Sequence, residues 1–415
     1  MNENRLKPVL EYNRENHDVT YIMYNAFRLN NNHAIAHVLD IQKERMNRSI
    51  VLVYPLETTQ RNRDFFNKGI ANYKEVLSTV FNHVDLLDRD SKEFLESFKN
   101  TSKIVMDMPY LKEEKDFYKK VLSVCELNEI ALELIETNLI VPVTYASNKE
   151  EYSARTIRKK IQLKIPYFLD SCIPIGQQFT YEEKALDVLE TFVELKLDHY
   201  HLKNQPEHDY VSGLSPYLKY GFISPITIYI AVYESPSSNK DLFLEELVVR
   251  RELAYNFVYY NTAYYQFESI TYAWAYTSMN DHIFDERTHL YDVDDYINYR
   301  THDVYFNTAM KEMVELGKMH GYMRMYWCKK IIEWSRTYQE AYEISIYLNN
   351  HYFLDGNTPN GYTGVAWCFG KHDRAWAPRQ IFGKLRYMNS NGLKRKFDID
   401  SYVKRINLEV EECYE

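Results

Sequence analysis

One short segment of this chain concentrates residue types that bind flat, anionic ligands. Residues 354–388 hold five of the twelve glycines and two of the five tryptophans, Trp367 and Trp376. Glycine lets a backbone approach a ligand closely, and tryptophan offers a flat stacking face. Arg374, Arg379 and Arg386 add planar guanidinium groups, the shape that matches phosphate. We therefore expect a ligand site here that also contacts nucleic acid.

A second candidate lies at 212–218, where two hydroxyls and a glycine stand just before a helical pattern. That composition is typical of a helix N-terminus that binds phosphate. Ser-x-x-Ser-Pro is equally typical of an ordinary helix cap, so the residues alone leave both interpretations open.

Charged and aromatic residues at helical spacing supply further candidates. Glu246 and Arg250 share one face of a predicted helix, which most simply means a surface ion pair. Trp327 and Trp334 lie two helical turns apart; such residues are usually core, but they can carry an electron when a redox group lies at one end. Arg324 and Asp355 could form a buried pair, which indicates a specified site more than it indicates stability.

The elements that must position these residues fall into two groups. Within the first 145 residues, short apolar runs at 19–23, 50–54, 104–108 and 139–143 alternate with amphipathic stretches at 61–82 and 112–124. This alternation predicts a parallel sheet covered by helices on both faces. No Gly-x-Gly-x-x-Gly follows any of these strands, so an ordinary dinucleotide-binding site is not expected.

From about Tyr181 the apolar residues recur only at helical spacing. The stretches concerned are 182–196, 242–260, 307–317, 325–334 and 339–348. The sequence therefore predicts an α/β N-terminal domain with a parallel sheet at 18–147, an interdomain connector at 148–178 and an all-α domain at 179–415.

Composition limits the kinds of partner. The five cysteines are scattered without a Cys-x-x-Cys pair, which argues against a zinc site or a disulfide framework. With no apolar run of membrane length and no signal-peptide pattern, we expect an intracellular protein, cytoplasmic or nucleoid-associated, with no membrane partner and no metal. The net charge of −9 gives no global footprint for nucleic acid, but basic runs at 155–164 and 371–396 could bind a phosphate backbone locally. Each run could equally be a solvated face.

Several segments, in order along nearly the whole chain from about Thr20, resemble the class II cyclobutane pyrimidine dimer photolyases of the photolyase/cryptochrome family. The matching segments are 141–161, 214–224, 245–257 and 319–334. The resemblance implies an antenna-type α/β domain followed by a helical domain that holds FAD, reduced in the active form. It also implies light-driven repair of pyrimidine dimers in ultraviolet-damaged DNA by electron transfer to a flipped-out lesion, carried out by a monomer.

The resemblance further assigns roles by position. It implies that Glu246 is catalytic and contacts the lesion, and that Trp327 and Trp334 belong to an electron chain. The implied flavin contacts are Tyr200, Ser212, Leu214, Ser215, Arg324, Asn349 and Asp355. The implied lesion and DNA contacts are Arg250, Met325, Trp367, Arg374 and Trp376.

Two segments depart from the family pattern. Where the family usually has His-Asp-Pro-Leu-Trp, this chain has His302-Asp-Val-Tyr-Phe306, so the middle tryptophan of the electron chain is missing. Photoreduction of oxidised flavin is thereby in question, although repair from reduced flavin is not; Tyr305 or a neighbouring tyrosine is one hypothetical substitute. Residues 24–34 match loosely, so a second antenna chromophore such as a deazaflavin is not assured.

Two other functions stay in view. The first is a flavin photoreceptor of the cryptochrome type, without repair activity. Glu246, Trp367, Trp376 and the basic segment favour repair, because a sensor has no need of a lesion pocket. The second is a light-independent nucleic-acid-binding protein, which would leave the flavin-type loop at 212–215 unexplained.

Overall fold

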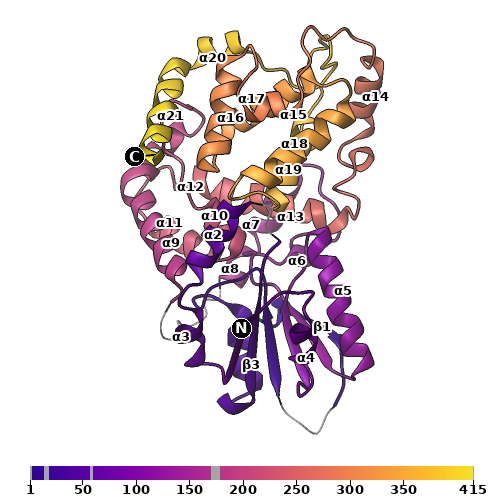
Figure 1. The fold of residues 1–415 in the computed structure, drawn as a ribbon, viewed down its shortest axis with the longest axis vertical. Helices are drawn as coiled ribbons and strands as arrows, with labels where there is room; N and C mark the ends of the chain where they lie inside the picture. Colours follow the sequence, from indigo (N-terminus) through magenta and orange to yellow (C-terminus); the bar gives the residue numbers. More distant parts are fainter. Residues whose placement is uncertain (1, 14–17, 57–58, 170–177, 415) are drawn as a thin grey trace.

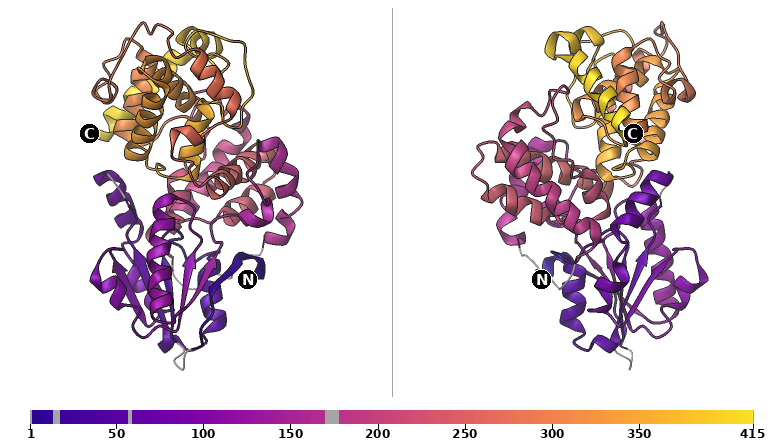
Figure 2. Two further views of the ribbon diagram at one scale, coloured as in Figure 1. Left: turned by 90° about the vertical axis from the view of Figure 1, so that its right-hand side faces the viewer. Right: turned by 60° about the vertical axis from the view of Figure 1, so that its left-hand side comes forward.

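A computed structural model describes residues 2–13, 18–56, 59–169 and 178–414 of the chain. Figure 1 shows an α/β domain below a domain built only from helices, in the order that the sequence predicts. The two views of Figure 2 show the magenta helices at mid-height and to one side, between the sheet below and the orange-to-yellow helices at the top.

The sheet has six strands in the order β1-β6-β5-β2-β3-β4. All neighbours are parallel except β1 and β6. Every residue of β2 is buried, as expected for a central strand covered on both faces. The strands are β1 (Leu6–Leu10), β2 (Val19–Met23), β3 (Arg48–Val53), β4 (His83–Leu87), β5 (Lys103–Asp107) and β6 (Ala131–Ile135). The helices of this domain are α1 (His33–Ile41), α2 (Gln60–Gly69), α3 (Tyr73–Ser78), α4 (Lys92–Glu96) and α5 (Lys112–Leu127).

One predicted strand is wrong. Residues 139–143 form no strand, and the last strand of the sheet is β6. The run is apolar because it is buried where the two domains meet, and its amides at Ile140 and Val141 donate to the Glu252 carboxylate instead of to a neighbouring strand. Three strands were not predicted: β1, which starts before the expected boundary at residue 18, β4 and β6. Strands β1 and β4 are edge strands and only partly buried, so neither shows a continuous apolar run, and Glu133 interrupts the apolar run of β6.

The predicted connector contains regular structure. Helices α6 (Val143–Ala146), α7 (Ala154–Gln162) and α8 (Ile165–Phe168) occupy most of 143–168, while residues 170–177 lie outside the described part of the chain. Helix α7 buries Ala154, Ile157 and Ile161 and keeps its basic residues on the other side. Its Arg158 makes a two-point contact with Glu245 of the helical domain, at 3.0 and 2.7 Å.

The helical domain confirms the helices predicted from spacing. Two of them contain π-helical turns, η3 (Phe192–Lys196) and η5 (Glu245–Arg250), which widen the helix locally and often occur at functional sites. Its helices are α9 (Thr180–Thr191), η4 (Leu197–Leu202), α10 (Ser215–Tyr220), α11 (Pro225–Glu234), α12 (Lys240–Leu244), α13 (Arg251–Tyr260), α14 (Ala273–Asp281), α15 (Val293–Ile297), α16 (Val304–Leu316), α17 (Gly321–Trp334), α18 (Tyr338–Tyr352), α19 (Pro359–Cys368), α20 (Ser390–Lys396) and α21 (Ile399–Tyr414).

Buried charged groups join the two domains. Arg28 is fully buried and donates to the carbonyl oxygens of Thr137 and Gly221, one from each domain, at 2.5 and 2.9 Å. The Glu182 carboxylate of α9 accepts from the amides of Leu29 and Asn30 at 2.9 and 2.7 Å. Each charge is bonded to backbone on the opposite side, so separating the domains would leave buried polar groups unsatisfied.

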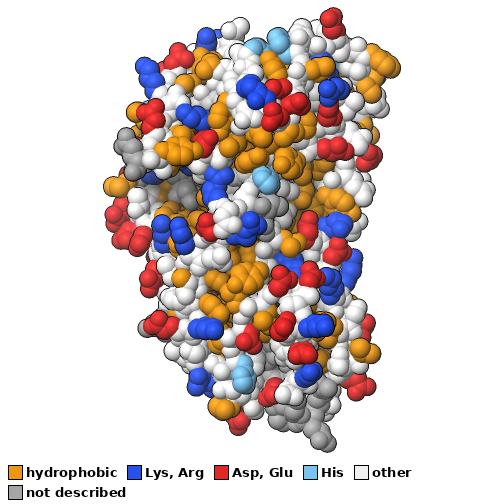
Figure 3. All heavy atoms as spheres, viewed as in Figure 1, with side chains coloured by type: hydrophobic (Ala, Val, Ile, Leu, Met, Phe, Trp, Pro, Cys, Tyr) orange, Lys and Arg blue, Asp and Glu red, His pale blue; other side chains and the backbone are white. Residues whose placement is uncertain are grey.

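The surface carries both signs of charge. Figure 3 shows blue and red side chains interspersed over one face, without a large region of a single sign. No helix in the described part of the chain is both long and apolar enough to span a membrane. No group of three or more His, Cys, Asp or Glu side chains among these residues could hold a metal ion.

Candidate functional site

The first part of the site is the π-helical turn η5. Its Glu246 side chain is 42% exposed, and its Oε1 accepts a hydrogen bond from Lys203 Nζ at 2.6 Å. Lys203 directly follows η4, and its ammonium also lies 5.1 Å from the centre of the Tyr200 ring. The surface ion pair expected between Glu246 and Arg250 is not what the structure shows, because Arg250 instead approaches Glu245 at 3.5 Å. Sequence spacing could not reveal Lys203, since it lies 43 residues from Glu246.

The same turn contributes one wall of the site. The Arg250 guanidinium stacks over the Trp367 ring of α19, 5.3 Å from its centre. The other contact of this indole is His372, whose ring centre lies 5.8 Å away in an edge-on arrangement. Trp367 remains partly exposed, so a flat cationic and aromatic surface faces outward from α19.

An ion pair predicted from sequence connects α17 to the segment after α18. Arg324 Nη2 donates to both carboxylate oxygens of Asp355, at 2.9 and 3.1 Å. The guanidinium also lies 3.9 Å from the centre of the Phe353 ring. The Arg324 and Asp355 side chains are 30% and 16% exposed, so this partly desolvated pair fixes the direction of both groups beside the open space described next.

Two helical glycines leave open space beside these groups. A Cβ added at Gly321 of α17 or at Gly364 of α19 would meet no atom within 4 Å, and both glycines are solvent-exposed. Helices α17 and α19 pack against each other. The residues before the glycines, His320 and Thr363, are buried, and His320 Nε2 and Thr363 Oγ1 lack a hydrogen-bond partner of normal geometry within the described residues. Each exposed glycine leaves room for a ligand on its helix, and glycine permits such a close approach.

His320 stays neutral in this setting. Burial, assisted by the charge of Arg405, lowers the pKa of the imidazole to about 4. Its Nδ1 accepts from the Tyr322 amide at 3.2 Å, so in the neutral ring Nε2 carries the proton. A hydrogen-bonding interaction with the Lys203 backbone opposes this lowering of the pKa. The Nε2–H group of His320 therefore lies near the Lys203 backbone.

The loop before α10 has the geometry of a turn. The Leu214 amide donates to Ser212 Oγ at 3.3 Å, Gly213 has a φ of +70°, and Leu214 is buried as an anchor. Ser215 then begins α10 and stays exposed. Both interpretations of this motif given above therefore survive, because a helix start and an exposed hydroxyl are each present.

Two further predicted flavin contacts are buried. Tyr200 packs edge-on against Phe192 and Phe243, with centre-to-centre distances of 5.8 and 5.3 Å, and burial raises the pKa of its hydroxyl. Asn349 of α18 donates from Nδ2 to Asn350 Oδ1 at 2.8 Å. Gly361 lets α19 approach this amide, since a Cβ there would lie 2.6 Å from Asn349 Nδ2.

The predicted tryptophan pair is buried in α17. Trp327 donates from Nε1 to the Met310 sulfur at 3.0 Å. Phe306 occupies the position where the family usually has tryptophan, and its ring lies 5.0 Å from that of Trp334. Tyr291 is the tyrosine that contacts Trp334, at 5.4 Å and edge-on, and its hydroxyl lies 2.8 Å from His302 Nδ1. Tyr305, the substitute named from sequence, bonds through its hydroxyl to Asp400 instead.

Trp376 has a different environment from Trp367. Arg374 and Arg386 each stack on its ring, at 5.0 and 5.3 Å, and its indole nitrogen donates to Asp373 at 3.3 Å. The structure thus brings Glu246, Arg250 and Trp367 into one neighbourhood and places Arg374 and Trp376 in another. Met325 is partly exposed on α17, next to Arg324.

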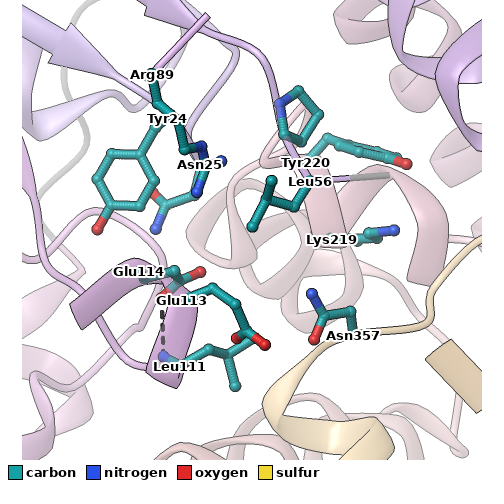
Figure 4. Close-up of a pocket in the computed structure, with 11 residues that line it drawn as sticks. Tyr24, Asn25, Leu56, Arg89, Leu111, Glu113, Glu114, Lys219, Tyr220 and Asn357 are labelled. Atoms are coloured by element: carbon teal, nitrogen blue, oxygen red, sulfur yellow. Dashed lines mark hydrogen bonds between the residues drawn. The ribbon is translucent and has the colours of Figure 1, made fainter. Parts of the chain in front are cut away.

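A separate small cavity lies where the parallel strands end. Figure 4 shows Tyr24 and Asn25 after β2, Leu56 after β3 and Arg89 after β4 facing residues of α5, α10 and the loop that carries Asn357. The carboxyl ends of neighbouring parallel strands that connect in opposite directions are a common ligand position. The volume is about 70 Å³, against roughly 300–1,000 Å³ for typical small-molecule pockets.

Comparison with known proteins identifies the family. The chain is 37% identical to the deoxyribodipyrimidine photo-lyase of Methanothermobacter thermautotrophicus, over 94% of each chain. It is 34% identical to the Arabidopsis thaliana enzyme of the same name, over 93% of this chain and 88% of the relative. The chain belongs to the photolyase/cryptochrome family. Four relatives carry the name deoxyribodipyrimidine photo-lyase, and this chain is an enzyme of the same kind.

Solved structures of photolyase/cryptochrome proteins share the fold. A cryptochrome from Synechocystis aligns with a TM-score of 0.73 over 95% of this chain and 89% of that chain, at 14% identity. An archaeal photolyase from Sulfolobus tokodaii, solved with two FAD molecules, aligns with a TM-score of 0.69 over 94% of this chain and 90% of that chain, also at 14% identity. No family model matches the chain.

Proposed function

We propose that this enzyme repairs cyclobutane pyrimidine dimers in ultraviolet-damaged DNA, driven by light, as a class II photolyase. The observation that carries the proposal is the partly exposed stack of Arg250 on Trp367, one turn after Gly364, where an added Cβ would meet no atom, together with the oriented Arg324–Asp355 pair at α17. The relatives named deoxyribodipyrimidine photo-lyase support the same substrate class.

The residues around the open space fit FAD. Arg324 and Asp355 would lie beside its ring system, with Asn349 near the ring edge. Ser212, Leu214 and Ser215 would hold its diphosphate at the start of α10, through the two serine hydroxyls and the backbone of the turn. Tyr200 would pack against it, and the Thr363 hydroxyl, which has no hydrogen-bond partner among the described residues, would gain one. When bound in reduced form, FAD supplies an electron on absorbing light.

The chain's own residues would bind and orient the lesion. A dimer must leave the base stack to be reached, and photolyases are among the standard examples of base flipping. Trp367 would offer its flat face, while Met325 would fill the apolar side. Glu246 would form a hydrogen bond with the pyrimidine, held in place by Lys203 at 2.6 Å. Arg250 would place a cation where negative charge develops.

A cryptochrome-type photoreceptor is the second candidate, because a cryptochrome shares the fold. The two functions differ in what they require beside the flavin. A sensor needs no cationic and aromatic wall open to solvent, whereas Arg250 and Trp367 form one. This observation favours repair.

One experiment separates the candidates. Purified protein with reduced flavin is illuminated with near-ultraviolet or blue light in the presence of an ultraviolet-damaged oligothymidine, and recovery of thymine absorbance is followed. Repair predicts recovery that requires light. The same protein with oxidised flavin and a dark sample are the controls, and no recovery with reduced flavin bound would rule out repair.

We treat a second chromophore such as a deazaflavin as part of this proposal. The cavity at the strand ends is the natural position for one, but its volume of about 70 Å³ is too small for a tricyclic ring. Such a chromophore would therefore require the side chains of Figure 4 to move apart. Absorbance spectra of the purified protein would reveal a bound antenna directly.

DNA as substrate has two further implications. An enzyme that repairs the genome works inside the cell, in the cytoplasm or at the nucleoid. The site is built from one chain, with every proposed contact from the same copy, so we propose a monomer as the active form. Gel filtration of the purified protein with light scattering tests the oligomeric state.

A further inference from the structure

A pair of stacked tyrosines lies at the surface where the connector meets the helical domain. Tyr152 precedes α7 and Tyr272 precedes α14, and their rings stack with centres 4.2 Å apart and planes at 14°. Tyr152 is 49% exposed, whereas Tyr272 is partly buried. Tyr272 thus covers one face of the Tyr152 ring, and the exposed part of that ring is open to a further flat group.

Hydrogen bonds fix the backbone around this stack. The Tyr272 hydroxyl donates to the Tyr152 carbonyl at 2.6 Å, which ties the two residues together. The buried Asn256 of α13 accepts from the Glu151 amide at 2.8 Å and donates to the Lys149 carbonyl at 3.0 Å. The Tyr152 ring is therefore positioned before any ligand arrives, which lowers the entropy cost of binding.

His372 connects the stack to the proposed lesion site. Its Nδ1 lies 2.7 Å from the Tyr152 carbonyl and 3.4 Å from the Tyr272 hydroxyl, and its ring lies edge-on to Trp367 at 5.8 Å. His372 is buried and has a φ of +58°, an uncommon conformation that persists where the surroundings enforce it. These four side chains form a continuous aromatic row from α19 to the connector.

The charges around the stack favour a nucleic acid strand. The two glutamates before Tyr152 are each paired with a lysine, so their negative charge is neutralised. Lys149 and Arg155 lie three residues to either side of Tyr152; both are exposed, and neither forms an ion pair within the described residues. Helix α7 also packs against η5, which carries Glu246. Free cations beside an exposed ring can contact phosphates while the ring contacts a base.

Flipping a dimer out of DNA changes the stacking of its neighbours. Each nucleotide beside the lesion loses the base that covered one of its faces. An aromatic side chain can replace that contact, because every base has a flat face on which it can stack. A strand with its lesion at Trp367 would meet Tyr152 on one side of the lesion, since the aromatic row leads from one to the other.

We propose that Tyr152 stacks on the base next to the lesion in the damaged strand, on one side of the dimer only. This inference rests on the proposed repair function and adds to it a subsite for a flanking nucleotide. A purine offers a larger face than a pyrimidine, so the subsite predicts tighter binding of lesions that have a purine on that side.

Two substitutions and one control isolate the stack. Tyr152→Ala removes the ring, whereas Tyr152→Phe keeps it. The control Tyr233→Ala removes a tyrosine of α11 that is 56% exposed and stacks on Tyr229 with planes at 11°, and that is not a proposed DNA contact. Both substituted positions are exposed, so all variants are expected to fold, which circular dichroism checks.

Affinity is measured on single strands that carry one dimer, with adenine or an abasic site at its 5′ or 3′ neighbour. For the wild type we expect an abasic site on one side to lower affinity about tenfold, and on the other side by no more than about twofold. Tyr152→Ala should bind the intact strand about tenfold more weakly and lose no more than about twofold further at the abasic site. Tyr152→Phe and Tyr233→Ala should match the wild type.

Three results would overturn the inference. The first is a wild type that is insensitive to an abasic site on both sides of the lesion. The second is a Tyr152→Ala variant that keeps the full sensitivity to the abasic site. The third is an equal loss of affinity in Tyr233→Ala, which would show an effect unrelated to the subsite.

Light-driven repair separates this inference from the proposed function. At saturating DNA, Tyr152→Ala should repair with the wild-type yield per absorbed photon, because Tyr152 would not contact the reacting rings; a lower yield would contradict the flanking position. A wild type that repairs dimers without distinguishing the flanking sites contradicts only the subsite. A wild type that binds the damaged strands with reduced flavin and does not repair them contradicts the proposed function.

Discussion

At the scale of single residues, the side chains of the proposed site are held by partners from other elements. Arg324 and Asp355 pair as expected, because both lie in segments whose composition indicated a site. The contact between Lys203 and Glu246 could not be predicted, since it depends on how η4 lies against η5. Trp376 shares a segment with Trp367 but contacts Arg374 and Arg386, in a cavity that it lines together with residues of α20.

Replacing Glu246 by Gln tests the residue proposed to contact the lesion. We expect lesion affinity to fall roughly tenfold, as a charge-assisted hydrogen bond contributes about 1.5 kcal/mol. The repair yield per absorbed photon should also fall, while the flavin-to-protein ratio stays unchanged because Glu246 is not a proposed flavin contact. Replacing Glu194 by Gln is the matched control, since this exposed glutamate lies on the other π-helical turn, η3, and is not a proposed contact. An unchanged affinity and yield in Glu246→Gln would remove this residue from the site.

At the scale of elements, helix α19 carries a destabilising glycine within the proposed site. Gly364 lies in the middle of the helix, where glycine costs about 1 kcal/mol relative to alanine. Because nothing fills the space beside it, packing does not explain the glycine. Helix α19 therefore gives up stability at a position where a ligand needs room.

Two substitutions at Gly364 should separate these effects. We expect Gly364→Ala to stabilise the flavin-free protein by roughly 0.5–1 kcal/mol in urea unfolding. Gly364→Leu would extend into the open space and should lower flavin or lesion binding without unfolding the protein. Full binding by the leucine variant would mean that the open space is not part of the site.

Helix α16 carries the departure from the family pattern. Phe306 is buried against Trp334, and phenylalanine is much harder to oxidise than tryptophan. We expect illumination to reduce the bound oxidised flavin slowly in the wild type and faster in Phe306→Trp, with absorbance at the flavin band as the readout. Repair started from reduced flavin should be the same in both proteins. Fast photoreduction in the wild type that is lost in Tyr291→Phe would instead assign the step to Tyr291, which contacts Trp334.

At the scale of the whole molecule, the two-domain order was predictable and the interface between the domains was not. Alternating strands and helices, followed by helices alone, determine the order because each pattern follows from burial on one or two faces. The interface depends on individual buried charges such as Arg28 and Glu252, which polar spacing does not distinguish from surface residues. Because residues 139–143 are buried at this interface, their apolar run predicts a strand that does not form.

The interface should make stability depend on pH. Burial raises the pKa of Glu136 to about 8, with Arg5 opposing the shift and Glu252 adding to it. Burial likewise raises the pKa of Glu252 to about 7 and that of Asp107 to about 6. In each case the folded state holds a proton that the unfolded state releases at about pH 4 to 4.5, so these groups make stability fall as pH rises from about 4 to 8.

Replacing Glu136 by Gln removes one of the groups whose protonation makes the free energy of unfolding depend on pH. We expect the variant to match the wild type near pH 5 and to be more stable by a few kcal/mol at pH 8, because the amide carries no charge to bury. Urea unfolding at several pH values measures the difference. Equal pH profiles for the two proteins would show that Glu136 ionises freely in the folded state.

The carbonyl contacts of Arg28 also have a consequence for recombination of domains. Arg28 lies in the α/β domain but donates to the Gly221 carbonyl of the helical domain. Glu182 lies in the helical domain and accepts from the amides of Leu29 and Asn30 in the α/β domain. Each domain thus satisfies backbone hydrogen-bonding groups of the other domain, so the two domains are not independent modules. A chimera that joins this sheet domain to the helices of a relative should fold only if the relative supplies the same partners at both positions.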